Sequence, residues 1–87
     1  MKSVVIYRPE SEHARAVETF VRDIAHQENI EFELIDVDTP RAMDMMALYG
    51  IMSHPAILVI RDDGQLVQYW AADKLPLIHE VAAFARG

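Results

Sequence analysis

One stretch combines a helix end, a proline and an apolar strand: Tyr49-Gly50-Ile51-Met52-Ser53-His54-Pro55-Ala56-Ile57-Leu58-Val59-Ile60. Glycine is typical of the position just past a helix, so Gly50 marks a helix end. The uninterrupted apolar run from Ala56 to Ile60 is typical of a strand that is covered on both faces. Pro55 fixes the turn into this strand, and the stretch therefore predicts a helix, a short loop and a central strand in succession.

Outward from this stretch, hydrophobic periodicity predicts the remaining elements. Apolar runs and apolar–polar alternation predict strands over residues 2–7, 30–37, 56–60 and 66–70. Helical spacing predicts helices from residue 11 to 26 or 27, from 40 or 41 to 49, and from 73 to 87. We expect Ser11 and Asp73 to act as N-caps, with Pro76 in the first turn of the last helix.

The element order β-α-β-α-β-β-α limits the topology. The first two strands need a crossover helix, so they are parallel, and the connection is right-handed. Asp62-Asp63-Gly64 supplies turn chemistry between the last two strands, which therefore form an antiparallel hairpin. We expect an α/β fold with a four-stranded mixed sheet in order 2-1-3-4 and helices on both faces, as a single domain over residues 1–87.

Composition excludes several classes of protein. Lys and Arg total 8 against 14 Asp and Glu, and the net charge of −6 disfavours nucleic acid and anionic membranes as partners. Without cysteine the chain has no disulfide, zinc–thiolate site or iron–sulfur cluster. We find no signal peptide or apolar run of membrane-spanning length, so we expect a cytoplasmic protein, and we expect no cofactor and no metal.

These features resemble the thioredoxin/glutaredoxin family. In thioredoxins a Tyr-Gly-Ile or Tyr-Gly-Val tripeptide ends a helix, and a cis-proline followed by an apolar strand comes four residues later. Tyr49-Gly50-Ile51 and Pro55 match that spacing. Leu34-Ile35-Asp36-Val37-Asp38 and Asp63-Gly64 are similar to the family's second strand and hairpin turn, so the resemblance spans nearly the whole chain. It implies a thioredoxin-like fold with a cis bond before Pro55.

The family's redox residues are missing. The position of the Cys-x-x-Cys motif is occupied by Ser11-Glu12-His13-Ala14, or by Glu12 to Arg15 with a shift of one residue. The buried acid that assists proton transfer in the family is matched by Val5. Dithiol exchange needs a thiolate nucleophile, which serine cannot replace. The chain is therefore no thiol–disulfide oxidoreductase, and we expect no enzyme of another kind.

The resemblance still implies a binding groove, because in the family the residue before the cis-proline pairs with an extended peptide. Its candidate residues are Ser11, Glu12, His13, Ala14, Ser53, His54 and Pro55. We expect a non-redox module that binds a protein or peptide partner or takes part in an assembly, as a monomer or as a weak homodimer through the edge of the fourth strand. The alternative is a small glutathione-binding or glutathione-transferase-like protein, with Ser11 or the 52–55 backbone on the ligand.

Two further interpretations, a serine hydrolase and a copper(I) site, have weaker support. Ser11 with His13 or His54 lacks the orienting acid and the Gly-x-Ser-x-Gly turn of a hydrolase. A copper(I) site could be drawn from His54 and the neighbouring methionines, which are Met43, Met45, Met46 and Met52. Methionines on a short helix are more often packing groups or an adaptable contact surface.

Overall fold

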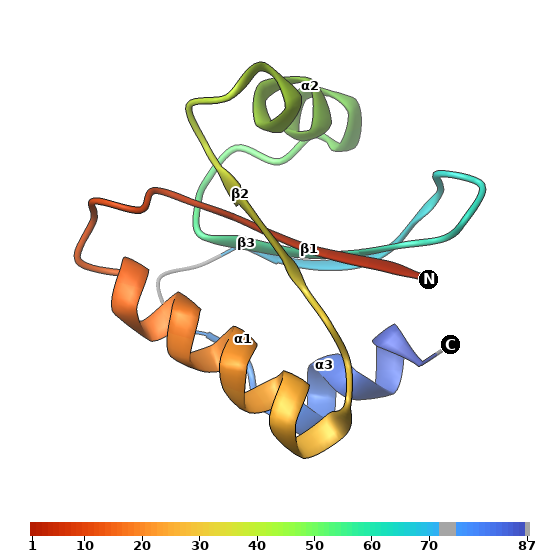
Figure 1. Cartoon of the computed structure of the whole chain (residues 1–87). Coiled ribbons are helices and arrows are strands. Elements are labelled where there is room, and N and C mark those ends of the chain that lie inside the picture. The colour runs from red at the N-terminus through yellow and green to blue at the C-terminus, as the bar shows by residue number, and fades with distance from the viewer. Residues whose placement is uncertain (72–74, 87) are drawn as a thin grey trace.

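The computed structural model describes residues 1–71 and 75–86. Its elements follow the predicted order (Figure 1). They are β1 (Lys2–Tyr7), α1 (Ala14–Glu28), β2 (Glu33–Asp36), α2 (Pro40–Tyr49), β3 (Ala56–Ile60), β4 (Leu66–Ala71) and α3 (Ile78–Ala85). Within the described residues, no helix is both long enough and apolar enough to cross a membrane.

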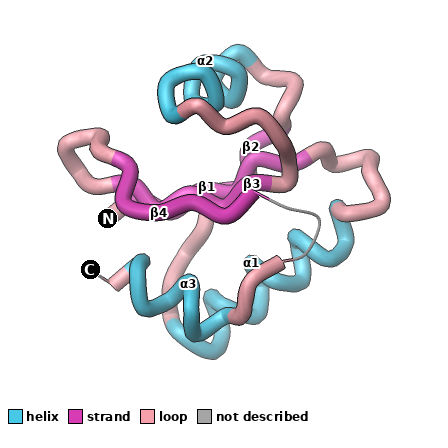
Figure 2. Tube along the Cα trace, turned by 180° about the vertical axis from the view of Figure 1, so that it is seen from behind, coloured by secondary structure: helices cyan, strands magenta, loops and turns pink. Residues whose placement is uncertain are grey.

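The strands form one sheet in the order β2-β1-β3-β4, which confirms the predicted order. The pairing of β1 with β2 is parallel, whereas β1 with β3 and β3 with β4 are antiparallel. The two helices α1 and α3 cover one face of the sheet and α2 covers the other (Figures 1 and 2). β1 and β3 are therefore the central strands, and β2 and β4 are the edges.

The sheet separates two hydrophobic clusters. The α1-side core contains Val5, Tyr7, Ala14, Val17, Phe20, Val21, Ile24, Phe32, Ile57, Val81 and Ala82. The α2-side core contains Val4, Ile6, Ile35, Val37, Ala42, Ile51, Ala56, Leu58 and Ile60. Successive side chains of a strand point to opposite faces, so β1 and β3 supply both clusters alternately. This explains why their sequences are apolar without interruption.

The start of α1 differs from the prediction. The helix begins at Ala14 rather than after Ser11, and its N-cap residue is His13. The Ser11 hydroxyl donates to the carbonyl oxygen of Arg8 (2.7 Å) and accepts from the His13 N–H (3.3 Å). Serine side chains compete with helix formation in this way, so Ser11 holds a turn ahead of the helix instead of capping it. At the other end α1 runs to Glu28, past the predicted residue 27.

The edges of three later elements also differ. β2 spans Glu33–Asp36 rather than 30–37, and Phe32, just before it, packs into the α1-side core. β4 continues to Ala71, one residue further than predicted. α3 starts at Ile78, so Pro76 precedes the helix instead of lying in its first turn. The predicted cap Asp73 lies outside the described residues.

The ends of α2 agree with the prediction. Thr39 is the N-cap, and its hydroxyl accepts from the backbone N–H of Ala42 (3.2 Å). Pro40 follows at the start of the helix, where its missing N–H costs nothing. Gly50 has φ of +69°, a left-handed conformation that closes the helix and turns the chain toward β3.

Candidate functional site

Two loops leave the sheet at the same end. Ile6 of β1 pairs with Ala56 of β3, so the segment that follows β1 and the segment that precedes β3 start side by side. The Val37 N–H also donates to the Tyr7 carbonyl (2.9 Å), which ties the end of β2 to the same place. Loops 8–13 and 51–55 accordingly lie at one end of the sheet in both views (Figures 1 and 2).

Exposure decreases along the loop before β3, from Met52 to Pro55. The His54–Pro55 peptide bond is cis. Pro55 is buried, His54 is half-buried and Ser53 is exposed. Met52 is 95% exposed, the largest exposure among the large hydrophobic side chains of the described residues. The loop therefore presents one apolar and two polar side chains to the surface.

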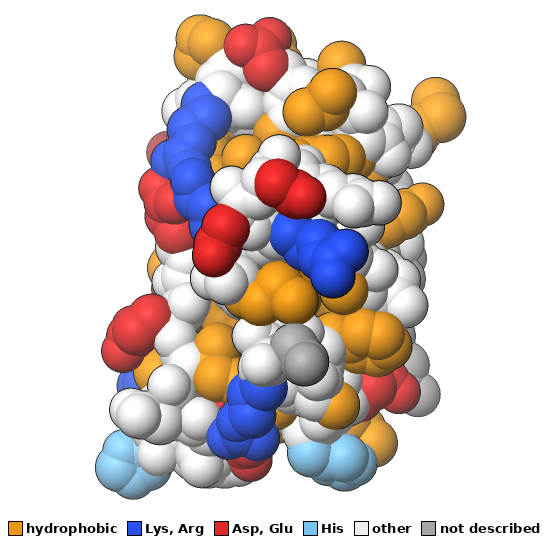
Figure 3. Space-filling model, turned by 90° about the vertical axis from the view of Figure 1, so that its right-hand side faces the viewer, with side chains coloured by type: hydrophobic (Ala, Val, Ile, Leu, Met, Phe, Trp, Pro, Cys, Tyr) orange, Lys and Arg blue, Asp and Glu red, His pale blue; other side chains and the backbone are white. Residues whose placement is uncertain are grey.

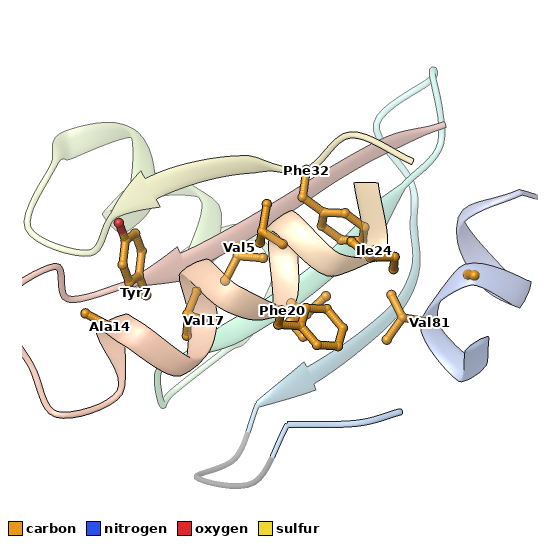
Figure 4. Close-up of a cluster of buried hydrophobic side chains, with 11 residues drawn as sticks. Val5, Tyr7, Ala14, Val17, Phe20, Ile24, Phe32 and Val81 are labelled. Carbon is orange, nitrogen blue, oxygen red and sulfur yellow. The ribbon is translucent and has the colours of Figure 1, made fainter. Parts of the chain in front are cut away.

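The predicted site residues around the start of α1 differ in their exposure. Glu12 is exposed and His13 is half-buried, so both are accessible at this end of the sheet. Ala14 is 8% exposed and belongs to the α1-side core, where it lies beside Tyr7 (Figure 4). Ala14 is thus a packing residue. Ser11 is half-buried and holds the turn before the helix, and the other accessible residues of the predicted set are Glu12, His13, Ser53 and His54, which we name the loop surface.

The hydroxyl of Ser11 is already engaged in two hydrogen bonds within the turn. Its hydroxyl proton is donated to the Arg8 carbonyl, and its oxygen already accepts from the His13 N–H. A serine nucleophile must instead donate its proton to a general base, and a serine that activates a bound thiol must donate toward sulfur. The turn therefore argues against both the hydrolase interpretation and a glutathione-activating Ser11.

A tyrosine–carboxylate pair joins the end of β1 to α1, and sequence reasoning did not predict it. The Tyr7 hydroxyl donates to Glu18 Oε2 (3.0 Å), while the Tyr7 side chain is 6% exposed. Burial raises the pKa of Tyr7, and the hydrogen bond and negative charge of Glu18 and the charge of Asp36 raise it further. Tyr7 is therefore held as a neutral phenol that fixes α1 to the end of β1.

Charges near the loop surface disfavour an anionic ligand. The guanidinium of Arg8 is paired with Asp38 (2.8 Å). Glu10 and Glu12 are exposed beside it, and Arg15 at the start of α1 is an exposed cation against these two carboxylates. The opposite end of the sheet, which carries the two termini, intersperses acidic and basic side chains with hydrophobic ones (Figure 3). Neither end thus resembles a basic anion-binding surface.

A shallow groove on α1 begins at Glu12. Its floor is apolar and is formed by Ala16 and Phe20 of α1 together with Leu75 and Ile78 near the start of α3. We name this feature the α1–Leu75 groove. Sequence reasoning missed it, because it depends on how α3 packs against α1 across more than half of the chain.

Metal binding has little structural support. Among residues 1–71 and 75–86, no three His, Asp or Glu side chains are grouped so that they could hold a metal ion. The methionines are also divided: Met45 and Met46 pack against the α2-side core, whereas Met43 and Met52 are exposed. Their arrangement fits the packing interpretation.

Comparison with known proteins supports the fold. No protein-family model matches the sequence, and no curated protein matches it significantly. Among solved structures, the chain is similar to thioredoxin 1 from the thermophilic eubacterium Thermosipho africanus TCF52B, with a TM-score of 0.67 and 19% sequence identity. The match covers 99% of this chain and 91% of that one. With its strand order, its helices on both faces and its lack of cysteine, this chain has a thioredoxin-like fold without the thiols of redox chemistry.

Proposed function

We propose that the protein is a non-redox binding module, which holds a peptide or protein partner at the loop surface. The observation that carries this proposal is the placement of Ser53 and His54, with the fully exposed Met52, beside the loop that precedes α1. Methionine is flexible and polarizable and suits an adaptable contact. Free backbone at a loop end can pair with an extended peptide.

The α1–Leu75 groove supports the same proposal. It starts at Glu12, which is also part of the loop surface, so the two features are contiguous. Recognition sites commonly combine an apolar floor with a few polar groups that fix orientation. A partner that contacts Glu12 at the loop surface could continue along α1 and place an apolar side chain on the floor formed by Phe20 and Leu75.

Binding of glutathione is the alternative, and it has less support. Its carboxylates would meet Glu10 and Glu12, while Arg8 is already paired with Asp38. A ligand at 100 times its Kd stabilises a protein by about 2.7 kcal/mol. We expect millimolar glutathione to leave the melting temperature unchanged, and a rise of several degrees would favour the alternative.

The test starts from a displayed peptide library selected on the purified protein, followed by titration of the selected peptides. We expect the double substitution Met52→Ser with His54→Ala to weaken binding at least tenfold. His79→Ala is the matched control, because His79 is an exposed histidine on α3, away from the loop surface. Circular dichroism verifies that each variant is folded. Failure to select any peptide, or equal affinity in all three proteins, would overturn the proposal.

A further inference from the structure

The free edge of β4 has a composition that favours strand pairing. β4 reads Leu-Val-Gln-Tyr-Trp-Ala and contains no charge, glycine or proline. Within residues 1–71 and 75–86, β4 pairs with β3 alone, because it is the last strand of the sheet. Short uncharged segments of this kind are prone to add another strand when an edge is exposed. A monomer would therefore need some feature of β4 that keeps a second copy from pairing with it.

The hairpin shows which backbone groups of β4 face that edge. The N–H of Arg61 donates to the carbonyl of Gln65 (2.8 Å), so the backbone of Arg61 faces β4. Successive residues of an antiparallel strand face opposite neighbours, so Val59 and Ile57 also face β4, whereas Leu58 faces β1. Tyr69 lies opposite Leu58. Its N–H and C=O therefore point away from β3, toward the open side of the sheet.

The side chain of Gln68 is hydrogen-bonded to this outward-facing N–H of Tyr69. Its side-chain Oε1 accepts the N–H of Tyr69 at 2.9 Å. The register also shifts next to it, since Val59 pairs with Gln68 but Ile60 pairs with Leu66. Val67 is thereby left as an extra residue in β4. Such bulges twist an edge and interrupt regular pairing.

We propose that Gln68 is an edge-blocking residue, which keeps the β4 edge closed to a second copy of this chain. An incoming antiparallel strand must place a carbonyl oxygen on the Tyr69 N–H. The side-chain amide oxygen of Gln68 already occupies the position that the carbonyl oxygen of the incoming strand would take. Removal of this side chain leaves an uncharged, β-prone edge whose natural partner is another β4. The proposal favours a monomer over a homodimer paired through this strand.

Amide exchange tests the contact in the wild-type protein and in Gln68→Ala. We expect the Tyr69 amide, followed by NMR, to exchange about fivefold faster in Gln68→Ala, as loss of one ordinary hydrogen bond implies. Gln68→Glu keeps an acceptor of the same length and should retain protection. Gln65→Ala is the control, because Gln65 is an exposed glutamine of the same hairpin. Equal exchange of Tyr69 in the wild type and Gln68→Ala would overturn the proposal.

Sedimentation velocity tests the consequence. We expect the wild type, Gln68→Glu and Gln65→Ala to stay monomeric, while Gln68→Val forms dimers or larger species at the same concentrations. Gln68→Ala serves as the second open-edge variant if valine disturbs the fold, which circular dichroism would detect. The proposal is overturned if folded Gln68→Val and Gln68→Ala remain monomeric alongside the wild type. A wild-type dimer whose contact maps to β4 would overturn it equally.

Discussion

Replacement of Tyr7 by phenylalanine removes one hydroxyl and keeps the ring in the α1-side core. The lost interaction is the hydrogen bond from the Tyr7 hydroxyl to Glu18 Oε2 (3.0 Å). Glu18 is exposed, so its carboxylate regains water when the partner disappears. The cost should therefore be that of an ordinary hydrogen bond, about 1 kcal/mol in the free energy of unfolding. For a domain of 87 residues this corresponds to a fall of about 4–8 °C in Tm.

The same substitution should change the response to alkaline pH. Burial, and then Glu18 and Asp36, raise the pKa of Tyr7 above its ordinary value of 10.0. Below that ordinary value the phenol is protonated in both the folded and the unfolded chain, and its stabilisation is complete. Above it the unfolded chain loses the proton first, so the stabilisation falls as the pH rises through the folded pKa. The advantage of the wild type over Tyr7→Phe should therefore shrink above about pH 10.

Urea unfolding of both proteins from pH 7 to pH 11 measures the two effects. Tyr69→Phe is the control, because Tyr69 is 40% exposed and its hydroxyl makes no hydrogen bond to any of the described residues. The control should match the wild type at pH 7 within a few tenths of a kcal/mol. If Tyr7→Phe is as stable as the wild type at pH 7, or if the difference between them does not change with alkaline pH, the pairing with Glu18 contributes nothing and the reasoning is refuted.

Three further substitutions test other parts of the structure. Leu58→Ala should cost about 2–5 kcal/mol by urea unfolding, since Leu58 is 0% exposed, whereas Leu48→Ala, at a position 73% exposed, should cost little. Thr39→Ala should cost about 1 kcal/mol in the same assay, because it removes the N-cap of α2, and Thr39→Ser should restore most of it. The hydrogen bond from Arg41 has the largest effect on Glu33 and lowers its pKa. Burial, the next largest effect, opposes it, and the charges of Arg41 and Lys2 lower the pKa further. Stabilisation by this pair is therefore complete above the ordinary pKa of Glu33 and is lost as the pH falls through the lowered pKa of the folded protein. NMR titration of Arg41→Gln should show that the pKa of Glu33 rises toward its ordinary value.

The architecture could be predicted because its signals are local and agree with one another. The apolar run of Ala56–Ile60 requires cover on both faces, and the turn sequence at Asp63-Gly64 permits a tight hairpin. A crossover between the first two strands then leaves few ways to order the sheet. The comparison with a solved thioredoxin and the observed strand order confirm this part.

The details of the site could not be predicted, because they depend on contacts between distant segments or on competing local bonds. Ser11 has the residue type of an N-cap, yet its hydroxyl turns back to Arg8. Ala14 falls in the window of the redox motif, yet it faces the core. The α1–Leu75 groove and the bond from Tyr7 to Glu18 arise from packing between elements, which single-residue patterns do not encode.

The alternation of β1 between two cores restricts how this strand can change. Val4 and Ile6 fill the α2-side core, while Val5 and Tyr7 fill the α1-side core. An insertion or deletion of one residue within β1 would present every later side chain to the opposite layer. The aromatic ring of Tyr7 would then meet α2 in place of α1, and its bond to Glu18 would be lost. β1 can therefore accommodate the exchange of one side chain for another more readily than a change in its length.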